Sequence, residues 1–237
     1  MTALEQLLAV QNHDTTADQL RHRRASLPER AQRAEVGARL DQVRAAAAAA
    51  EERRAVLHRS QLRLEEDVAA VEAKAAHTNQ VLYGGAVTNP RELQGLQDEL
   101  KALKRRQQHL EDQVLDVMEQ LEPVHVEGDH LASQQAELTA ELERLDQVIT
   151  ATEAEIDVEL NAVTGGRARS VAGLPGDLVS EYEALRARLG GIGVARLKGT
   201  RCDGCNLALS AVEISRLRKL DPDALVHCDE CGRLLVR

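Results

Sequence analysis

The chain lacks the aromatic residues that usually fill a globular core. Its 237 residues include no Phe, no Trp and only two Tyr. A chain of this length is long enough to bury a large core. Because 29% of its residues are charged, and Ala, Leu, Glu, Gln and Arg are abundant, we expect it to bury a narrow aliphatic seam instead.

Long apolar runs are also absent. No segment approaches the roughly 20 apolar residues that a membrane-spanning helix needs. Residues 1–20 include Glu5, Asp14 and Asp18 and do not have the apolar stretch of a signal peptide. We therefore expect a soluble, cytoplasmic protein that has no membrane partner.

Glycine and cysteine are scarce in the first part of the chain. Ten of the 15 glycines follow Thr164, and all four cysteines lie later still, within the last 36 residues. The residues up to Thr164 thus favour helices, and the residues after it favour turns. We predict two domains, a coiled-coil hairpin over 1–165 and a small metal-binding domain over 166–237.

Two heptad registers indicate the coiled coil. The first runs from Val36 to Leu82, where eleven of 14 core positions are apolar, and the second runs from Leu93 to Ile156. A repeat of 3.5 residues over this length is typical of a left-handed coiled coil. We also expect Leu27-Pro28 to break or kink the first arm, and Pro123 with Gly128 to kink the second.

Residues 83–89 separate the two registers and form the predicted tip of the hairpin. Paired glycines here end the first helix. Asn89 can cap the second helix, Pro90 can take its first position, and Glu92 can complete a capping box. The two arms then lie antiparallel. Tyr83, an exposed aromatic on this tip, is a candidate contact for a protein partner, although it can also pack over the glycine turn.

The four cysteines form two C-x2-C pairs separated by 22 residues. Facing pairs of this kind build the tetrahedral four-thiolate cage that Zn2+ favours. Asn206 and Gly232 follow the two pairs and tolerate the left-handed backbone of such a turn. Two disulfides or a redox pair are the alternatives. We predict one structural Zn2+ per chain, held by Cys202, Cys205, Cys228 and Cys231.

The segments around the cage are short. They are predicted to be helices over 177–189 and 210–217, and strands over 192–198, 225–227 and 234–237. Ser210 can cap the second helix, with Glu213 at the capping-box position. A module this small depends on its metal for much of its folding free energy.

Charge differs between the two predicted domains. Residues 1–165 hold 18 Lys/Arg and 30 Asp/Glu, whereas residues 166–237 hold 12 and 9. The basic surplus can serve as a phosphate-contacting surface for RNA or DNA, or it can be a solvated rim. The candidate nucleic-acid-binding residues are Arg196, Lys198, Arg201, Arg216, Arg218 and Lys219.

Three stretches of sequence share the order seen in a known family. The first is Leu82-Tyr83-Gly84-Gly85 with Thr88-Asn89-Pro90 and Glu92-Leu93-Gln94; the second is Leu174-Pro175 with Asp177-Leu178, Tyr182, Leu185-Arg186 and Gly190-Gly191; the third runs from Cys228 to Leu235. The chain thereby resembles bacterial coiled-coil proteins with a C-terminal C4-type zinc ribbon. This resemblance implies a bent helical hairpin bearing a ribbon, without enzymatic activity. Some members of that family are implicated in flagellar or secretion gene regulation, through contacts with a sigma factor and mRNA.

The sequence therefore predicts a mainly α protein, with a long antiparallel coiled-coil hairpin and a small α+β zinc-ribbon domain. No arrangement of nucleophile, base or paired carboxylates indicates an enzyme or a small-molecule substrate. We expect a non-enzymatic adaptor or regulator, whose arm binds protein partners and whose ribbon binds nucleic acid or a transcription-related partner. The alternative is a purely protein-binding scaffold or chaperone with a structural zinc site.

Overall fold

A computed structural model describes residues 2–221 and 224–237. Contacts group the chain into two compact units. We call Gln32–Arg144 the hairpin unit, and Met1–Ala31 with Leu145–Arg237 the ribbon unit. The predicted division into 1–165 and 166–237 is a different one, and it stays a prediction.

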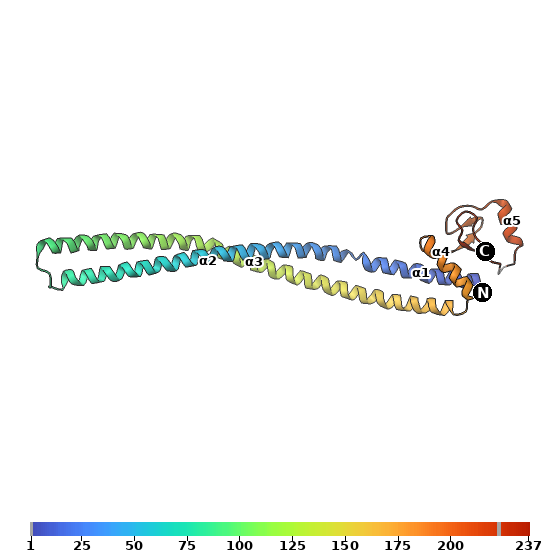
Figure 1. Cartoon of the computed structure of the whole chain (residues 1–237), viewed down its shortest axis with the longest axis horizontal. Coiled ribbons are helices and arrows are strands. Elements are labelled where there is room, and N and C mark those ends of the chain that lie inside the picture. Colours follow the sequence, from blue (N-terminus) through green and yellow to red (C-terminus); the bar gives the residue numbers. More distant parts are fainter. Residues whose placement is uncertain (1, 222–223) are drawn as a thin grey trace. The chain divides into compact units, whose positions relative to one another are not determined.

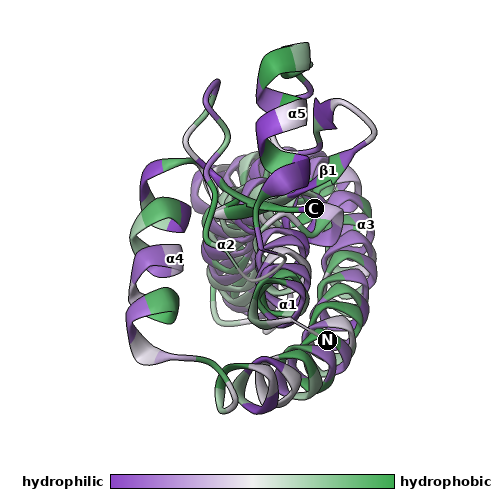
Figure 2. Cartoon of the chain, turned by 90° about the vertical axis from the view of Figure 1, so that its right-hand side faces the viewer, coloured by the Kyte–Doolittle hydropathy of each residue, from purple (hydrophilic) through white to green (hydrophobic). Residues whose placement is uncertain are grey.

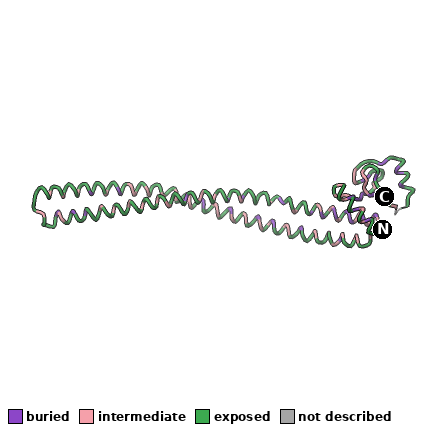
Figure 3. The backbone as a smooth tube through the Cα atoms, in the orientation of Figure 1, coloured by how far each residue is buried: buried purple, intermediate pink, exposed green. Residues whose placement is uncertain are grey.

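The hairpin unit contains the larger parts of two long helices, α2 (Pro28–Tyr83) and α3 (Pro90–Val171), which lie side by side and antiparallel (Figure 1). The buried residues of α2 are Val36, Leu40, Ala50, Ala75, Thr78 and Leu82, and all of them lie in the predicted heptad register. Figure 3 shows such buried positions recurring along otherwise exposed helices. The antiparallel coiled-coil hairpin is thus confirmed.

The turn between the helices follows the predicted chemistry. The Asn89 side chain accepts a hydrogen bond from the backbone N–H of Arg91 at 3.0 Å, and its carbonyl accepts one from Leu93 at 3.0 Å. Gly85 has a φ of 75°, which glycine adopts without strain. The reciprocal capping-box bond, in which the Glu92 carboxylate accepts from the backbone N–H of Asn89, is not among the hydrogen bonds of the described residues.

The prolines have different effects on the two arms. Helix α1 (Ala3–Ala25) ends before Leu27, and α2 begins at Pro28, so the predicted break is confirmed. Helix α3 continues through Pro123 and Gly128 without a break, and the predicted kink at these residues stays a prediction. A proline inside a helix removes one backbone donor, and the helix can resume on either side of it.

The ribbon unit packs two further helices, α4 (Gly176–Arg188) and α5 (Ala211–Lys219), against a small three-stranded sheet. The strands of this sheet are β1 (Val194–Lys198), β2 (Arg201–Cys202) and β3 (Leu234–Val236). The strand order is β2-β1-β3, with β1 antiparallel to β2 and parallel to β3. Residues 225–227 do not form the predicted strand, although His227 makes an isolated bridge to Leu234. Figure 2 shows polar and apolar residues alternating along α4 and α5, as expected for amphipathic helices.

Helix α1 belongs to the core of the ribbon unit. Its residues Leu4, Leu7 and Val10 pack with Tyr182 of α4 and Val194 of β1. The buried side chain of Gln11 accepts a hydrogen bond from the backbone of Gly193 at 2.8 Å and donates to the carbonyl of Gly191 at 2.9 Å. Helix α1 therefore fixes the strand that leads into the first cysteine pair.

Across the described residues, no helix is both long enough and apolar enough to cross a membrane.

Candidate metal centre and ribbon surface

The two cysteine pairs converge on one point. Their four sulfur atoms all lie within 4.8 Å of one another, and the Sγ atoms of Cys202 and Cys231 are 4.0 Å apart. All four are free thiols, so the disulfide alternative is not what the structure contains. Cys202 and Cys228 are buried, whereas Cys205 and Cys231 are half-buried.

Two equivalent backbone turns aim these thiols. In the first, the N–H of Asn206 donates to the carbonyl of Cys202 at 2.8 Å; in the second, the N–H of Gly232 donates to that of Cys228 at 2.7 Å. Asn206 has a φ of 60° and Gly232 one of 73°. The predicted left-handed positions are thus confirmed, because a turn this tight reverses the chain through that conformation.

Arg233 supports the cage and was not identified from the sequence. Its guanidinium donates to the carbonyls of Ile192 and Leu189, each at 2.9 Å, and so ties the second cysteine pair to the end of α4. Its side chain also lies close to the first cysteine pair. A Cβ added at Gly204, which lies between Cys202 and Cys205, would be only 2.6 Å from Arg233 Cδ. No signal near Arg233 in the sequence marks this role.

The surroundings give the thiols different acidities. Burial raises the pKa of Cys228 to about 12 and also raises that of Cys202. Burial acts in the same direction on Cys231, but hydrogen bonds from the backbone and guanidinium of Arg233 outweigh it and hold that pKa at about 7. Without a metal the buried thiols keep their protons at neutral pH, so a bound cation must displace them.

The donor set fits zinc. With Zn–S bonds near 2.3 Å, a tetrahedral four-thiolate site places its sulfur atoms about 3.8 Å apart. The observed 4.0 Å between Cys202 and Cys231 is close to that value. Four cysteines fill the tetrahedron, so the ion would stabilise the fold and leave no open position for a substrate. The neighbouring His227 lies 2.9 Å from Glu181 through its Nε2 and does not join the cage.

The structure separates the candidate nucleic-acid-binding residues into two groups. Ala195 and Leu197 of β1 pack against α5, so Arg196 and Lys198 point to the opposite face of the strand. Arg201 is the cross-strand neighbour of Lys198 and extends that group. The second group, Arg216, Arg218 and Lys219, occupies the last turns of α5. All six side chains are exposed.

Two of these cations already have acidic partners. The Nε of Arg216 lies 2.8 Å from Glu213, and the Nζ of Lys198 lies 2.9 Å from Asp203. Ion pairs of this kind lower the charge that the surface presents to a phosphate. Tyr83, the candidate partner contact, is 75% exposed at the hairpin tip.

Comparisons with known proteins agree with this architecture. Residues 10–190 match the model of the CT398-like coiled coil hairpin domain, and residues 201–235 match the C4-type zinc ribbon domain. An uncharacterized protein of Mycobacterium tuberculosis is 33% identical over 98% of this chain and 94% of its own length. One of Mycobacterium leprae is 30% identical over 72% of this chain and 73% of its own length.

Solved structures show the same fold. A protein from Mycobacterium smegmatis matches with a TM-score of 0.86 and 29% identity over the full length of both chains. CT398 from Chlamydia trachomatis matches with a TM-score of 0.67 and 21% identity, over 99% of this chain and 97% of its own. A coiled-coil hairpin and a C4-type zinc ribbon are also the two domains that the family models describe. The chain therefore belongs to the family of CT398-like coiled-coil hairpin proteins that carry a C4-type zinc ribbon.

Proposed function

We propose that this protein is a non-enzymatic adaptor or regulator that joins a protein partner to nucleic acid or to a transcription-related protein. The observation that supports this proposal most strongly is the closed cage formed by Cys202, Cys205, Cys228 and Cys231 next to six exposed basic side chains. Such a site has a structural role and no free coordination position for catalysis. Because the cage needs reduced thiols, a cytoplasmic location fits it.

The ribbon carries the proposed nucleic-acid contact. Arg196, Arg201, Arg218 and Lys219 have no ion-pair partner within the described part of the chain, so these cations are available for phosphates. The ribbon has no aromatic side chain after Tyr182 on which a base could stack. Binding is therefore expected to depend on phosphate charge and to discriminate weakly between sequences.

The hairpin carries the proposed protein contact. Tyr83 presents a large exposed ring at the tip, where an aromatic residue can anchor a partner. If the ion pairs of Arg216 and Lys198 persist in solution, the ribbon surface favours the second candidate function. In that case the protein is a protein-binding scaffold whose zinc is purely structural.

Salt-dependent binding separates these two functions. Labelled single-stranded RNA and duplex DNA are titrated with the zinc-loaded full chain at several salt concentrations. Each phosphate contact is expected to contribute about 0.7 to 0.9 to the slope of log affinity against log salt. Joint replacement of Arg216, Arg218 and Lys219 by Gln should weaken binding to all sequences and lower that slope.

A matched triple replacement tests whether the effect belongs to the ribbon. Lys104, Arg105 and Arg106 of α3 are also three exposed cations, and their replacement by Gln should leave binding unchanged. Zinc content, measured by native mass spectrometry, should remain one ion per chain in both variants. Absence of binding to either polymer at low salt would reject the nucleic-acid function and leave the protein-binding scaffold.

A further inference from the structure

The seam between α2 and α3 has few buried residues at the middle of the hairpin unit. Buried residues occur towards both ends of the unit, for example Val36 and Ala75 on α2, and Leu103 and Leu138 on α3. Within the described hairpin, residues 51–74 of α2 and 111–130 of α3 contribute no buried residue. Two helices alone therefore leave their own seam partly open here.

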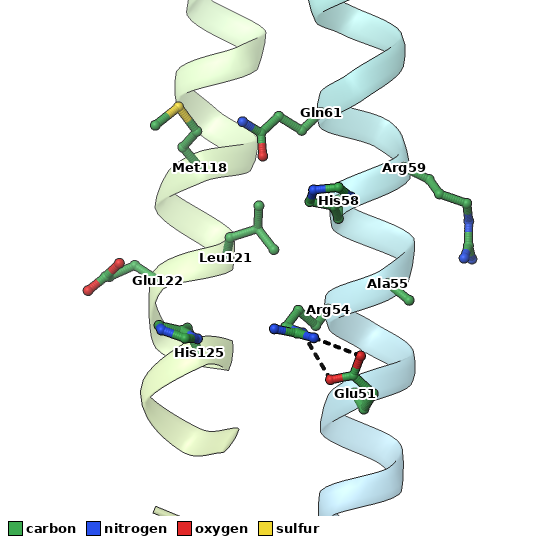
Figure 4. Close-up of a pocket in the computed structure, with 10 residues that line it drawn as sticks. All are labelled: Glu51, Arg54, Ala55, His58, Arg59, Gln61, Met118, Leu121, Glu122 and His125. Atoms are coloured by element: carbon green, nitrogen blue, oxygen red, sulfur yellow. Dashed lines mark hydrogen bonds and ion pairs between the residues drawn. The ribbon is translucent and has the colours of Figure 1, made fainter. Parts of the chain in front are cut away.

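A groove of about 580 Å³ lies along this stretch, between α2 and α3 (Figure 4). Two positions of the α2 register hold polar residues, Arg54 and Gln61, instead of aliphatic ones. The Nε of Arg54 lies 2.9 Å from a carboxylate oxygen of Glu51. Met118 and Leu121 supply the apolar part of the opposite wall.

Large apolar side chains continue beside the groove. Met118, which lines it, is 48% exposed, and Leu62 and Leu115, on the same helix faces by their spacing, are 47% and 56% exposed. A two-stranded coiled coil needs only the two core positions of each heptad to be apolar. A wider apolar stripe is typical of a helix that packs against more than one neighbour, and an exposed patch of this kind indicates an interface.

The two rims of the groove carry opposite charges. Arg59 extends outward from α2 and Glu122 extends outward from α3 on the other side (Figure 4). Neither makes an ion pair within the part of the chain that the structure describes. The ion pair between Arg53 and Glu127, at 2.8 Å, sets the register of the two helices. In this register Leu62 lies level with Met118, and Arg59 lies within one residue of the level of Glu122.

We propose that the groove binds a second copy of this chain, so that the middle of the hairpin forms a four-helix bundle. The two hairpins pack face to face about a twofold axis parallel to their length. Helix α2 of each copy then lies over α3 of the other. This arrangement places Leu62 against Met118 of the second copy, and Arg59 against Glu122 of the second copy.

Charge complementarity identifies a second copy as the occupant. A twofold interface uses the same surface on both molecules, so each contact occurs twice with the partners exchanged. The rims of the groove satisfy this condition. The basic rim and the acidic rim lie at the same level, so the rotation brings the basic rim of each copy against the acidic rim of the other. Flanking ion pairs of this kind set partner choice and orientation between helices. Dimer formation of this kind needs no ligand of the ribbon.

Sedimentation velocity of the zinc-loaded full chain over a wide micromolar range tests the proposal. A concentration-dependent dimer is expected, and Met118→Glu should shift it to monomer. Val56→Glu is the matched control, because Val56 is 52% exposed on α2 but does not line the groove. Circular dichroism and zinc content should show that both variants remain folded.

Charge reversal tests the pairing itself. Arg59→Glu and Glu122→Arg should each weaken the dimer by about tenfold, because each change creates two like-charge contacts. The double variant should recover the dimer. A chain that remains monomeric throughout, Val56→Glu acting as strongly as Met118→Glu, or a double variant no better than the single ones would each overturn the proposal. A foreign helix would then be the better candidate occupant.

Crosslinking tests the direction of the axis. A Leu62→Cys chain and a Met118→Cys chain of distinguishable mass are mixed and treated with a short bismaleimide while zinc protects the native thiols. The expected product joins one chain of each kind. Products that join only two Leu62→Cys chains would overturn the parallel axis, because that axis places the two α2 helices diagonally apart.

Discussion

Asp14 is a buried carboxylate with two strong partners in the ribbon unit. It accepts hydrogen bonds from Arg167 Nε at 2.7 Å and from the Tyr182 hydroxyl at 2.8 Å. The side chain of Tyr182 is fully buried, and this burial raises the pKa of its phenol. The network joins α1, α3 and α4, and a buried polar network stabilises a fold only while every member is satisfied.

Tyr182→Phe should therefore destabilise the protein. The change removes one hydrogen bond to a buried carboxylate and adds no compensating donor, so unfolding should become easier by about 1–3 kcal/mol. Urea denaturation measures this difference. Tyr83→Phe is the control, because Tyr83 is exposed at the tip, and its effect should stay within about 0.5 kcal/mol. Equal effects of the two changes would contradict the importance of the network.

Zinc affinity should rise with pH. Because the Cys228 pKa is raised to about 12, its thiol is protonated in the metal-free protein at neutral pH, and zinc must displace that proton. The pKa of Cys231 is about 7, so acidification below that value adds a further proton that zinc must displace. Chelator competition should show affinity falling towards acid pH, and falling more steeply below about pH 7. An affinity independent of pH would argue against thiolate ligation.

At the scale of elements, replacing either of two hairpin glycines by alanine is expected to change stability in opposite directions. Gly85 lies in the turn after α2 with a φ of 75°, whereas Gly95 lies inside α3 with open space where a Cβ would be added. Gly85→Ala should destabilise the hairpin by about 1–2 kcal/mol, because alanine is strained in the left-handed region. Gly95→Ala should stabilise it by up to about 1 kcal/mol through helix propensity. Thermal unfolding compares them, and shifts of the same sign would contradict this account.

Elements defined by local chemistry could be predicted from the sequence. The paired glycines and Asn89-Pro90 specify the turn, because each acts on its own neighbours. The same holds for Ser210, whose side chain accepts a hydrogen bond from the backbone of Glu213 at 3.1 Å. The C-x2-C spacing likewise predicts the convergence of four thiols, since metal geometry restricts where the two pairs can lie.

Contacts between distant segments could not be predicted. Gln11 looks like an ordinary polar helix residue, yet it bonds to Gly193. Arg233 looks like one of several ribbon cations, yet it satisfies two carbonyls near the end of α4. Nothing near either residue in the sequence specifies its partner. For the same reason, the sequence could not show that Arg196 and Arg218 belong to different groups of cations. The side of the sheet that α5 covers depends on packing between distant segments.

At the scale of the whole molecule, the hairpin topology predicts where a crosslink forms. Cysteines at Leu82 and Leu93 flank the tip of one chain, on helices joined by a short turn. A short bismaleimide should join them within one chain, so the product should keep the mass of a monomer at high dilution. Products found only between chains would contradict the hairpin. A pair at Leu82 and Leu131 is the control, because Leu131 lies far along α3 and should not react with Leu82.

The packing of α1 into the ribbon unit has a consequence for synthesis of the protein. Gln11 and Gly193 are 182 residues apart in sequence. At typical translation rates, about 10 to 40 seconds pass between their emergence from the ribosome. Throughout that interval, Leu4, Leu7 and Val10 have no strand or α4 to cover them. The apolar face of α1 therefore stays without these packing partners until the ribbon sequence has been synthesised.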